Sequence, residues 1–127
     1  MTRREFKRVF NVWFKILRLT HWEIYFDWDT EPENDIALAS IAMEDDYDIA
    51  HLRLADGWKE WDEYTLNRVI IHELLHLHFR DYDELLDTAV RTLSADAKDL
   101  IRKQAHHEVE GLIDRLAHSF VDAHGFA

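Results

Sequence analysis

The sequence predicts a compact α+β domain: an N-terminal helix, a small three-stranded and mainly antiparallel sheet, and a series of C-terminal helices. Apolar residues recur at helical spacing near the N-terminus and again after residue 62. Aromatic and β-branched residues concentrate in three short segments between these regions. A chain of 127 residues has room for one core, so we expect residues 1–127 to form a single domain.

The first expected element is an amphipathic helix over residues 3–18. Its apolar residues share one face, which should cover the core: Phe6, Val9, Phe10, Trp13, Phe14 and Leu17. The first residues lead into this helix and not into an uninterrupted apolar run, and no stretch approaches membrane-spanning length. We therefore expect no signal peptide, no membrane partner and a cytoplasmic location.

Three strands are expected next, over residues 21–28, 36–43 and 47–54, because these segments favour a pleated, half-buried surface. The loop 29–35 holds the only proline, and the acidic turn 44–46 separates the second strand from the third.

Helices are expected for the remainder of the chain. The first runs from about residue 62 to residue 80, and a second helical pattern covers residues 83–93. Ser94 or Asp96 is suited to cap the last helix. That helix carries apolar residues at core spacing: Leu100, Ile101, Ala105, Val109, Leu112, Ile113, Leu116 and Phe120.

Composition narrows the classes of function. The formal net charge of −11 argues against nucleic acid as a partner, because binding to phosphates needs a basic surface. The absence of cysteine excludes disulfides, thiolate metal sites and cysteine nucleophiles. Any metal ion must therefore be held by histidine and carboxylate side chains.

The most informative segment is His72-Glu73-Leu74-Leu75-His76. Residues four apart on a helix lie one turn apart on the same face, so His72 and His76 can bind one metal ion together. Glu73 is displaced around the helix toward the position of a metal-bound water. This is the H-E-x-x-H arrangement, in which two histidines hold Zn²⁺ and the glutamate takes a proton from the water.

The surrounding sequence places this motif on a helix. No glycine or proline occurs between Gly57 and Gly111, so nothing interrupts a helix across the motif. An apolar stripe runs through it: Leu66, Val69, Ile70, Leu74 and Leu77. The alternative interpretation is a histidine-rich core helix without a metal, but its polar groups would be costly to bury without partners.

A catalytic zinc usually has three protein ligands, so a third is needed. A histidine shortly after the motif is excluded, because Tyr82 stands where one common arrangement would need it. The candidates lie on the last helix: Glu110, His106 and Glu108. Helix geometry favours Glu110 without excluding the other two.

With Glu110 and Asp114 at E-x-x-x-D spacing after H-E-x-x-H, the chain resembles the gluzincin metallopeptidases. It is most similar to their minimal single-domain members, the minigluzincin and phage metallopeptidase-like proteins, which implies a zincin-like fold. The resemblance implies that Glu110 is the third zinc ligand. It also implies that Asp114 is the carboxylate that orients a ligand histidine, a common role beside metal-bound imidazole.

These observations predict a zinc-dependent metallopeptidase that acts on a peptide or protein substrate. Glu73 is expected to be the general base for a zinc-activated water and then to protonate the leaving amine. An extended peptide is expected to add to an edge strand, for which residues 47–54 are the candidate. Two alternatives remain: a zinc-binding but catalytically silent module, and a metal-free helical interaction protein.

Overall fold

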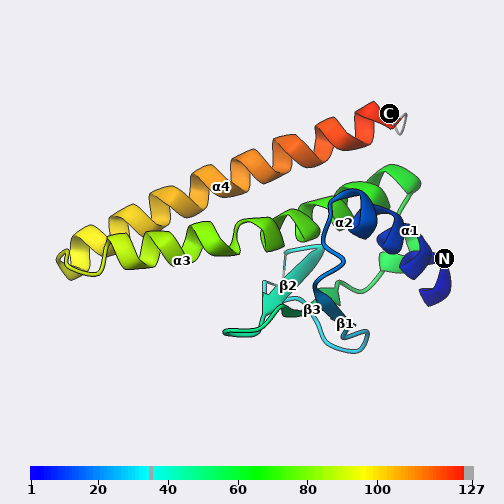
Figure 1. Cartoon of the computed structure of the whole chain (residues 1–127). Coiled ribbons are helices and arrows are strands. Elements are labelled where there is room, and N and C mark those ends of the chain that lie inside the picture. Colours follow the sequence, from blue (N-terminus) through cyan, green and yellow to red (C-terminus); the bar gives the residue numbers. More distant parts are fainter. Residues whose placement is uncertain (35, 125–127) are drawn as a thin grey trace.

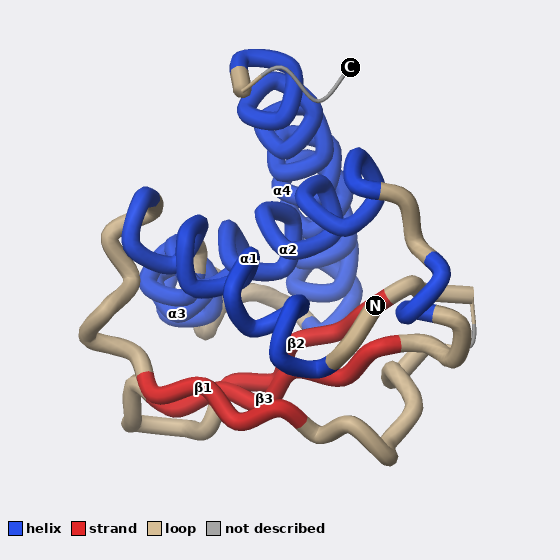
Figure 2. The backbone as a smooth tube through the Cα atoms, turned by 90° about the vertical axis from the view of Figure 1, so that its right-hand side faces the viewer, coloured by secondary structure: helices blue, strands red, loops and turns tan. Residues whose placement is uncertain are grey.

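The α-helices lie on one side of a three-stranded sheet in the computed structural model, which describes residues 1–34 and 36–124 (Figures 1 and 2). The elements follow this order: α1 (Arg3–Ile16), β1 (Glu23–Phe26), β2 (Ala39–Met43), β3 (Ile49–Leu54), the 3₁₀ turn η1 (Trp58–Glu60), α2 (Glu63–His78), α3 (Arg80–Ala89) and α4 (Ala95–Ala123). The expected α+β class is confirmed. Asp35, the last residue of the expected loop 29–35, and residues 125–127 of the expected domain lie outside the described residues.

The sheet has the strand order β1-β3-β2 and is mixed. β2 and β3 form an antiparallel hairpin, whereas β1 pairs with β3 in parallel. The expectation of a mainly antiparallel sheet therefore needs correction for β1. The cause is that the segment between β1 and β2 carries the chain past the position of β3, so β1 meets β3 and not its neighbour in sequence.

β3 is the central strand, and this corrects the expectation that residues 47–54 form an edge. Ala50 is the partner of Ile24 on one side and of Met43 on the other. Both edges of β3 are thus occupied, and no peptide can add to it. The edge strands of the described sheet are β1 and β2.

α1 begins with a capping box, in which the Thr2 side chain and Glu5 bond to each other's backbone N–H groups. Phe6, Phe10 and Trp13 are buried on the face that the sequence predicted. The two phenylalanines contact an aromatic cluster contributed by β1 and the segments after the strands. This packing fixes α1 over the sheet.

α2 is the central helix of the core. The Asp62 side chain caps it by accepting a hydrogen bond from the Thr65 backbone N–H at 2.7 Å. All five residues of the predicted apolar stripe are buried. Asn67 lies beside them, and its side-chain oxygen accepts a 2.7 Å hydrogen bond from Trp13 Nε1, which ties α2 to α1.

α4 is capped by Ser94 and returns alongside α3 and α2 (Figure 1). Its second half enters the core through Val109, Ile113 and Ala117. Its first half and α3 extend beyond the sheet, so Leu100 and Ile101, which were predicted at core spacing, are exposed. Leu112, predicted likewise, is 38% exposed. Within the described residues, no helix has the length and apolar character needed to cross a membrane.

Candidate metal centre

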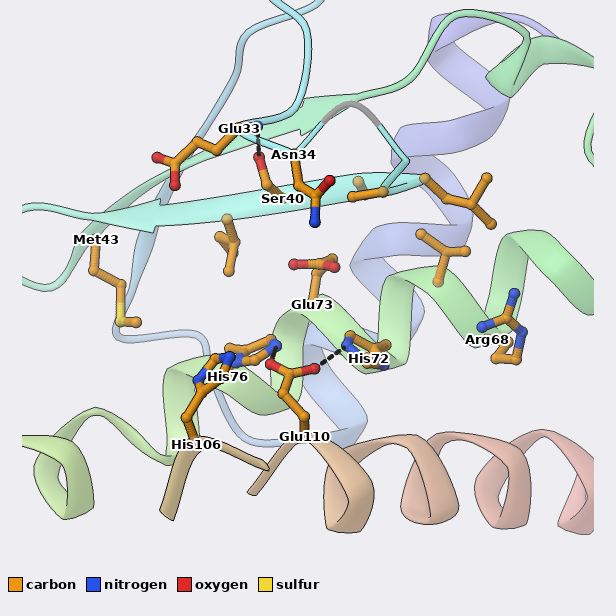
Figure 3. Close-up of a pocket in the computed structure, with 15 residues that line it drawn as sticks. Glu33, Asn34, Ser40, Met43, Arg68, His72, Glu73, His76, His106 and Glu110 are labelled. Carbon is orange, nitrogen blue, oxygen red and sulfur yellow. Dashed lines mark hydrogen bonds and ion pairs between the residues drawn. The ribbon is translucent and has the colours of Figure 1, made fainter. Parts of the chain in front are cut away.

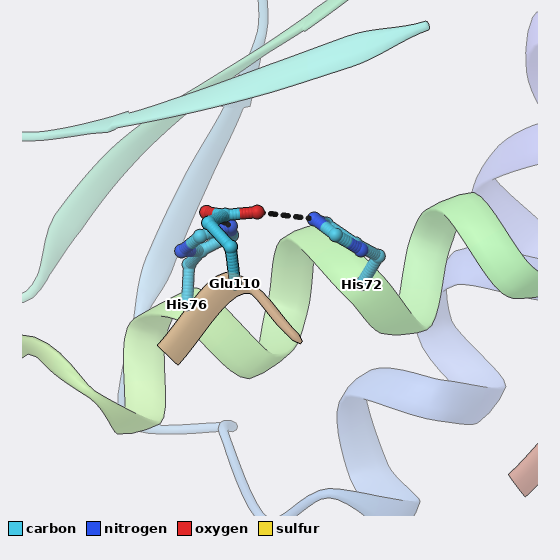
Figure 4. A group of neighbouring side chains, drawn as sticks. All are labelled: His72, His76 and Glu110. Atoms are coloured by element: carbon cyan, nitrogen blue, oxygen red, sulfur yellow. Dashed lines mark ion pairs between the residues drawn. The ribbon is translucent and has the colours of Figure 1, made fainter. Parts of the chain in front are cut away.

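Helix α2 presents the H-E-x-x-H motif toward a pocket of about 600 Å³. His72 and His76 lie one turn apart and are both partly buried, with side chains 20% and 23% exposed. Their side chains point to the same side of α2 (Figure 4). The buried stripe on the other side of α2 holds this orientation, because it fixes how the helix is rotated against the core.

Helix α4 supplies the third side chain of the group. The antiparallel return of α4 places Glu110 opposite both histidines (Figure 4). Glu110 Oε2 lies 3.4 Å from His72 Nε2, and Glu110 Oε1 lies 3.0 Å from His76 Nε2. Val109, directly before Glu110, is buried, so packing of α4 on α2 sets the position of the carboxylate.

The three donor groups fit a zinc ion. One donor atom from each of His72, His76 and Glu110 lies within 4.8 Å of the others. Four ligands around zinc at roughly 2.0–2.2 Å would lie about 3.4 Å apart in a tetrahedron. Two imidazoles and one carboxylate are a donor set that zinc accepts in hydrolytic sites, with the fourth position left for water.

The other two candidates for the third ligand are placed differently. His106 is one turn before Glu110 and lines the same pocket (Figure 3), but it is outside the group of close donor atoms. Glu108 is exposed and accepts a hydrogen bond from Gln104 Nε2 at 3.2 Å. The structure therefore brings Glu110, and neither rival, into contact with both histidines.

The pocket lies between the two metal-site helices and strand β2 (Figure 3). Ala39, Ser40, Ile41 and Met43 of β2 line it, together with residues of the segment before the strand. β2 is an edge strand that pairs with β3 along one side. An edge strand thus lies beside the candidate metal centre, although it is not the strand expected from the sequence.

Glu73 extends into the pocket between β2 and the two histidines (Figure 3). Only 8% of the residue is exposed, yet it makes no hydrogen bond or ion pair with any other described residue. Burial, and secondly the negative charge of Glu110, raise the pKa of Glu73 to about 8. A carboxyl group with such a pKa exchanges its proton near neutral pH, as a general base requires.

Burial also lowers the pKa of His76. The charge of Glu110 opposes this change, while His72 and His106 add to it. The neutral imidazole is therefore favoured, and this is the form that has a lone pair free to bind a metal.

A further set of polar groups extends from the metal centre along α4. Asp114 Oδ1 lies 3.9 Å from His72 Nδ1 and 3.8 Å from His118 Nε2. His118 Nδ1 in turn shares a hydrogen bond with the Tyr64 hydroxyl. Asp114 thus lies on the side of His72 away from Glu110, the position needed to orient that ring.

Asp114 was among the site residues expected from the sequence, whereas His118 and Tyr64 were not. A signal was present for His118, because it lies four residues after Asp114 on α4 and therefore on the same face of that helix. Comparison of the chain with protein-family models, with curated proteins and with solved structures gave no match. The candidate site is therefore defined by its geometry.

Proposed function

We propose that this protein is a zinc-dependent peptidase of the gluzincin type, with His72, His76 and Glu110 as zinc ligands and Glu73 as general base. The observation that carries this proposal is the state of Glu73. This residue is only 8% exposed, its carboxyl group forms no hydrogen bond with another described residue, and it faces a pocket beside two histidines and a glutamate in ligand geometry. Burial raises the pKa of this carboxyl group, and a carboxyl with a raised pKa in a pocket is typical of a catalytic acid or base.

In this proposal, zinc and the chain's own residues have separate roles in hydrolysis. Bound zinc would lower the pKa of water and polarise a carbonyl group. Glu73 accepts the proton from the attacking water and delivers it to the leaving amine. Asp114, whose Oδ1 lies 3.9 Å from His72 Nδ1, would favour the His72 tautomer that binds a metal through Nε2.

β2 supplies the binding surface for the substrate in this proposal. Its side chains line the pocket, and it is an edge strand, so an extended peptide can pair with its backbone. Such pairing would bring a peptide carbonyl over the metal centre. A peptide or protein is therefore the class of substrate that suits this pocket.

The test combines metal content with hydrolysis. Elemental analysis should find about one zinc per chain in the wild type and in Glu73→Gln, and none in His72→Ala. The wild type should cleave members of a fluorogenic peptide library, and Glu73→Gln should be slower by roughly 10²–10⁴-fold because the proton transfer is lost. Undiminished cleavage by Glu73→Gln would remove Glu73 from this role. Bound zinc without any cleavage by the wild type would instead indicate a catalytically silent zinc-binding module.

A further inference from the structure

Arg68 is a cation in the pocket of the candidate metal centre, and no ion pair joins it to another of the residues that the structure describes. It lies on α2 one turn before His72, is partly buried, and lines the same pocket as the three ligand residues (Figure 3). It forms no ion pair or hydrogen bond with another described residue. The chain has 26 acidic and 15 basic residues, so an unpaired arginine in a pocket is not explained by a shortage of carboxylates.

The neighbouring acidic residues are engaged elsewhere or do not reach Arg68. Glu110 contacts the two histidines, and Glu33 lies 3.9 Å from Arg53. The pKa of Asp62 is lowered mainly by hydrogen bonds from Thr65, with only the smallest contribution from the charge of Arg68. The guanidinium group of Arg68 is therefore available to an anion that enters the pocket.

A carboxylate is the group that suits this cation in a peptidase. A guanidinium group presents paired N–H donors that match the two oxygens of a carboxylate. Other arginines of the chain contact carboxylates, since Arg80 and Arg102 each place one guanidinium nitrogen against a carboxylate oxygen, of Asp48 and Asp87 respectively. The partial burial of Arg68 strengthens an interaction of this kind, because water screens it less than at the open surface.

The position of Arg68 indicates where on the substrate this carboxylate lies. The backbone positions of Arg68 and His72 lie one helical turn apart, about 6 Å along α2, which equals roughly two residues of an extended peptide. Met43, at the end of β2, lies at the His76 end of the pocket, and Arg68 lies at the other end (Figure 3). A peptide that pairs antiparallel with β2, the more stable arrangement, therefore runs from the Met43 end toward Arg68.

We propose that Arg68 binds a substrate carboxylate about two residues to the C-terminal side of the cleaved bond. This inference rests on the proposed peptidase function and adds a substrate class to it. The carboxylate has two sources: an Asp or Glu side chain within a longer peptide, or the C-terminus of the substrate itself. In the second case the enzyme would release C-terminal dipeptides.

The test uses four versions of a peptide obtained from the library screen. All four peptides end two residues after the cleaved bond. The last residue is Glu or Gln, and the C-terminus is a free acid or an amide. The zinc-loaded wild type should favour peptides with a carboxylate by roughly 10- to 100-fold in kcat/KM, as for hydrogen bonds between charged groups. Arg68→Ala should lose this preference at unchanged zinc content, and Arg68→Lys should keep part of it. Arg91→Ala is the matched control, because Arg91 is exposed and lies outside the pocket.

The outcomes separate this inference from the proposed function. A preference for Glu over Gln with either terminus identifies the side chain as the source, and a preference for the free acid alone identifies the C-terminus. Equal rates for all four peptides, or an unchanged preference in Arg68→Ala, would overturn the inference and leave the peptidase intact. If the wild type cleaves no peptide, the peptidase proposal fails. Calorimetric binding of Glu-scanned and Gln-scanned peptides, as acids and as amides, to zinc-loaded wild type and Arg68→Ala then decides whether Arg68 recognises a carboxylate.

Discussion

At the scale of single residues, Glu108 and Glu110 show how helix geometry separates two identical side chains. They are two positions apart on α4, which turns them to nearly opposite sides of the helix. Glu110 lies against His72 and His76, whereas Glu108 is exposed and bonded to Gln104. The pair therefore offers a matched comparison for the metal site.

Replacement of Glu110 by Ala should lower zinc affinity by more than tenfold, and Glu108→Ala should leave it unchanged. Loss of a direct ligand should exceed the roughly 10- to 100-fold effect typical of outer partners of metal ligands. Affinity is measured by competition with a chromophoric chelator, with circular dichroism as the control for folding. If Glu108→Ala weakened zinc binding and Glu110→Ala did not, Glu108 and not Glu110 would be the third ligand.

Sequence reasoning reached His72, Glu73 and His76 because their relation is local: five consecutive residues of one helix define it. Glu110 needed the resemblance as well, since helix geometry alone left His106 and Glu108 open. The contact between Tyr64 and His118 was out of reach, because it depends on how α2 and α4 are aligned across 54 residues of chain. Spacing within one helix does not determine the alignment of two helices.

At the scale of elements, the strands were predicted close to their observed positions, but their order in the sheet was not. Composition indicates that a segment is a strand, whereas strand order depends on pairing between distant segments. β3 consequently proved to be central and β2 to be the edge beside the candidate metal centre. Because β3 is central, a polar side chain of β3 can contact polar side chains beside both β1 and β2.

His51 is the centre of these polar groups. It belongs to β3, and its ring lies 3.0 Å from Glu44 Oε2, just after β2, and 3.4 Å from Asp27 Oδ2, just after β1. The hydrogen bond with Glu44 is the main cause of a raised His51 pKa; burial opposes it, and Asp27 adds to it. Protonated His51 therefore connects all three strands.

This arrangement predicts a pH-dependent contribution to stability. The pKa of His51 is raised above 6.5 in the folded protein, so its stabilisation is fully present below pH 6.5 and is lost as pH rises through the folded value. The wild type should exceed His51→Gln in free energy of unfolding by less than about 1 kcal/mol, since the pairs are partly exposed. That difference should shrink as the pH increases.

Urea unfolding at several pH values on both sides of 6.5 measures this difference. His107→Gln is the control, because His107 is exposed and makes no ion pair with a described residue. A difference between wild type and His51→Gln that stays constant with pH would show that protonation of His51 does not stabilise the sheet.

At the scale of the whole molecule, α3 and the first half of α4 extend beyond the sheet as a helical hairpin (Figure 1). Helical periodicity predicted that Leu100 faces a core, but it is 69% exposed, and Leu85 on α3 is 67% exposed. Periodicity reports that one face of a helix is apolar and does not report whether another element covers it. The second half of α4 is different, because α2 packs against it and the candidate metal centre lies between them.

A metal ion in this position would join two helices that are far apart in sequence, so we expect zinc to stabilise the entire fold. A ligand that binds only the folded state at 100 times its Kd contributes about 2.7 kcal/mol, equivalent to several degrees in Tm for a chain of this size. Scanning calorimetry should therefore show a higher Tm with zinc and a lower Tm after EDTA treatment.

The shift should disappear in His72→Ala and in Glu110→Ala but persist in Glu108→Ala. An identical Tm for the wild type with zinc and with EDTA would mean that α2 and α4 are held together by packing alone, as in a metal-free helical interaction protein. A zinc-dependent shift confined to the chains that retain His72 and Glu110 would show that the ion bridges the two helices.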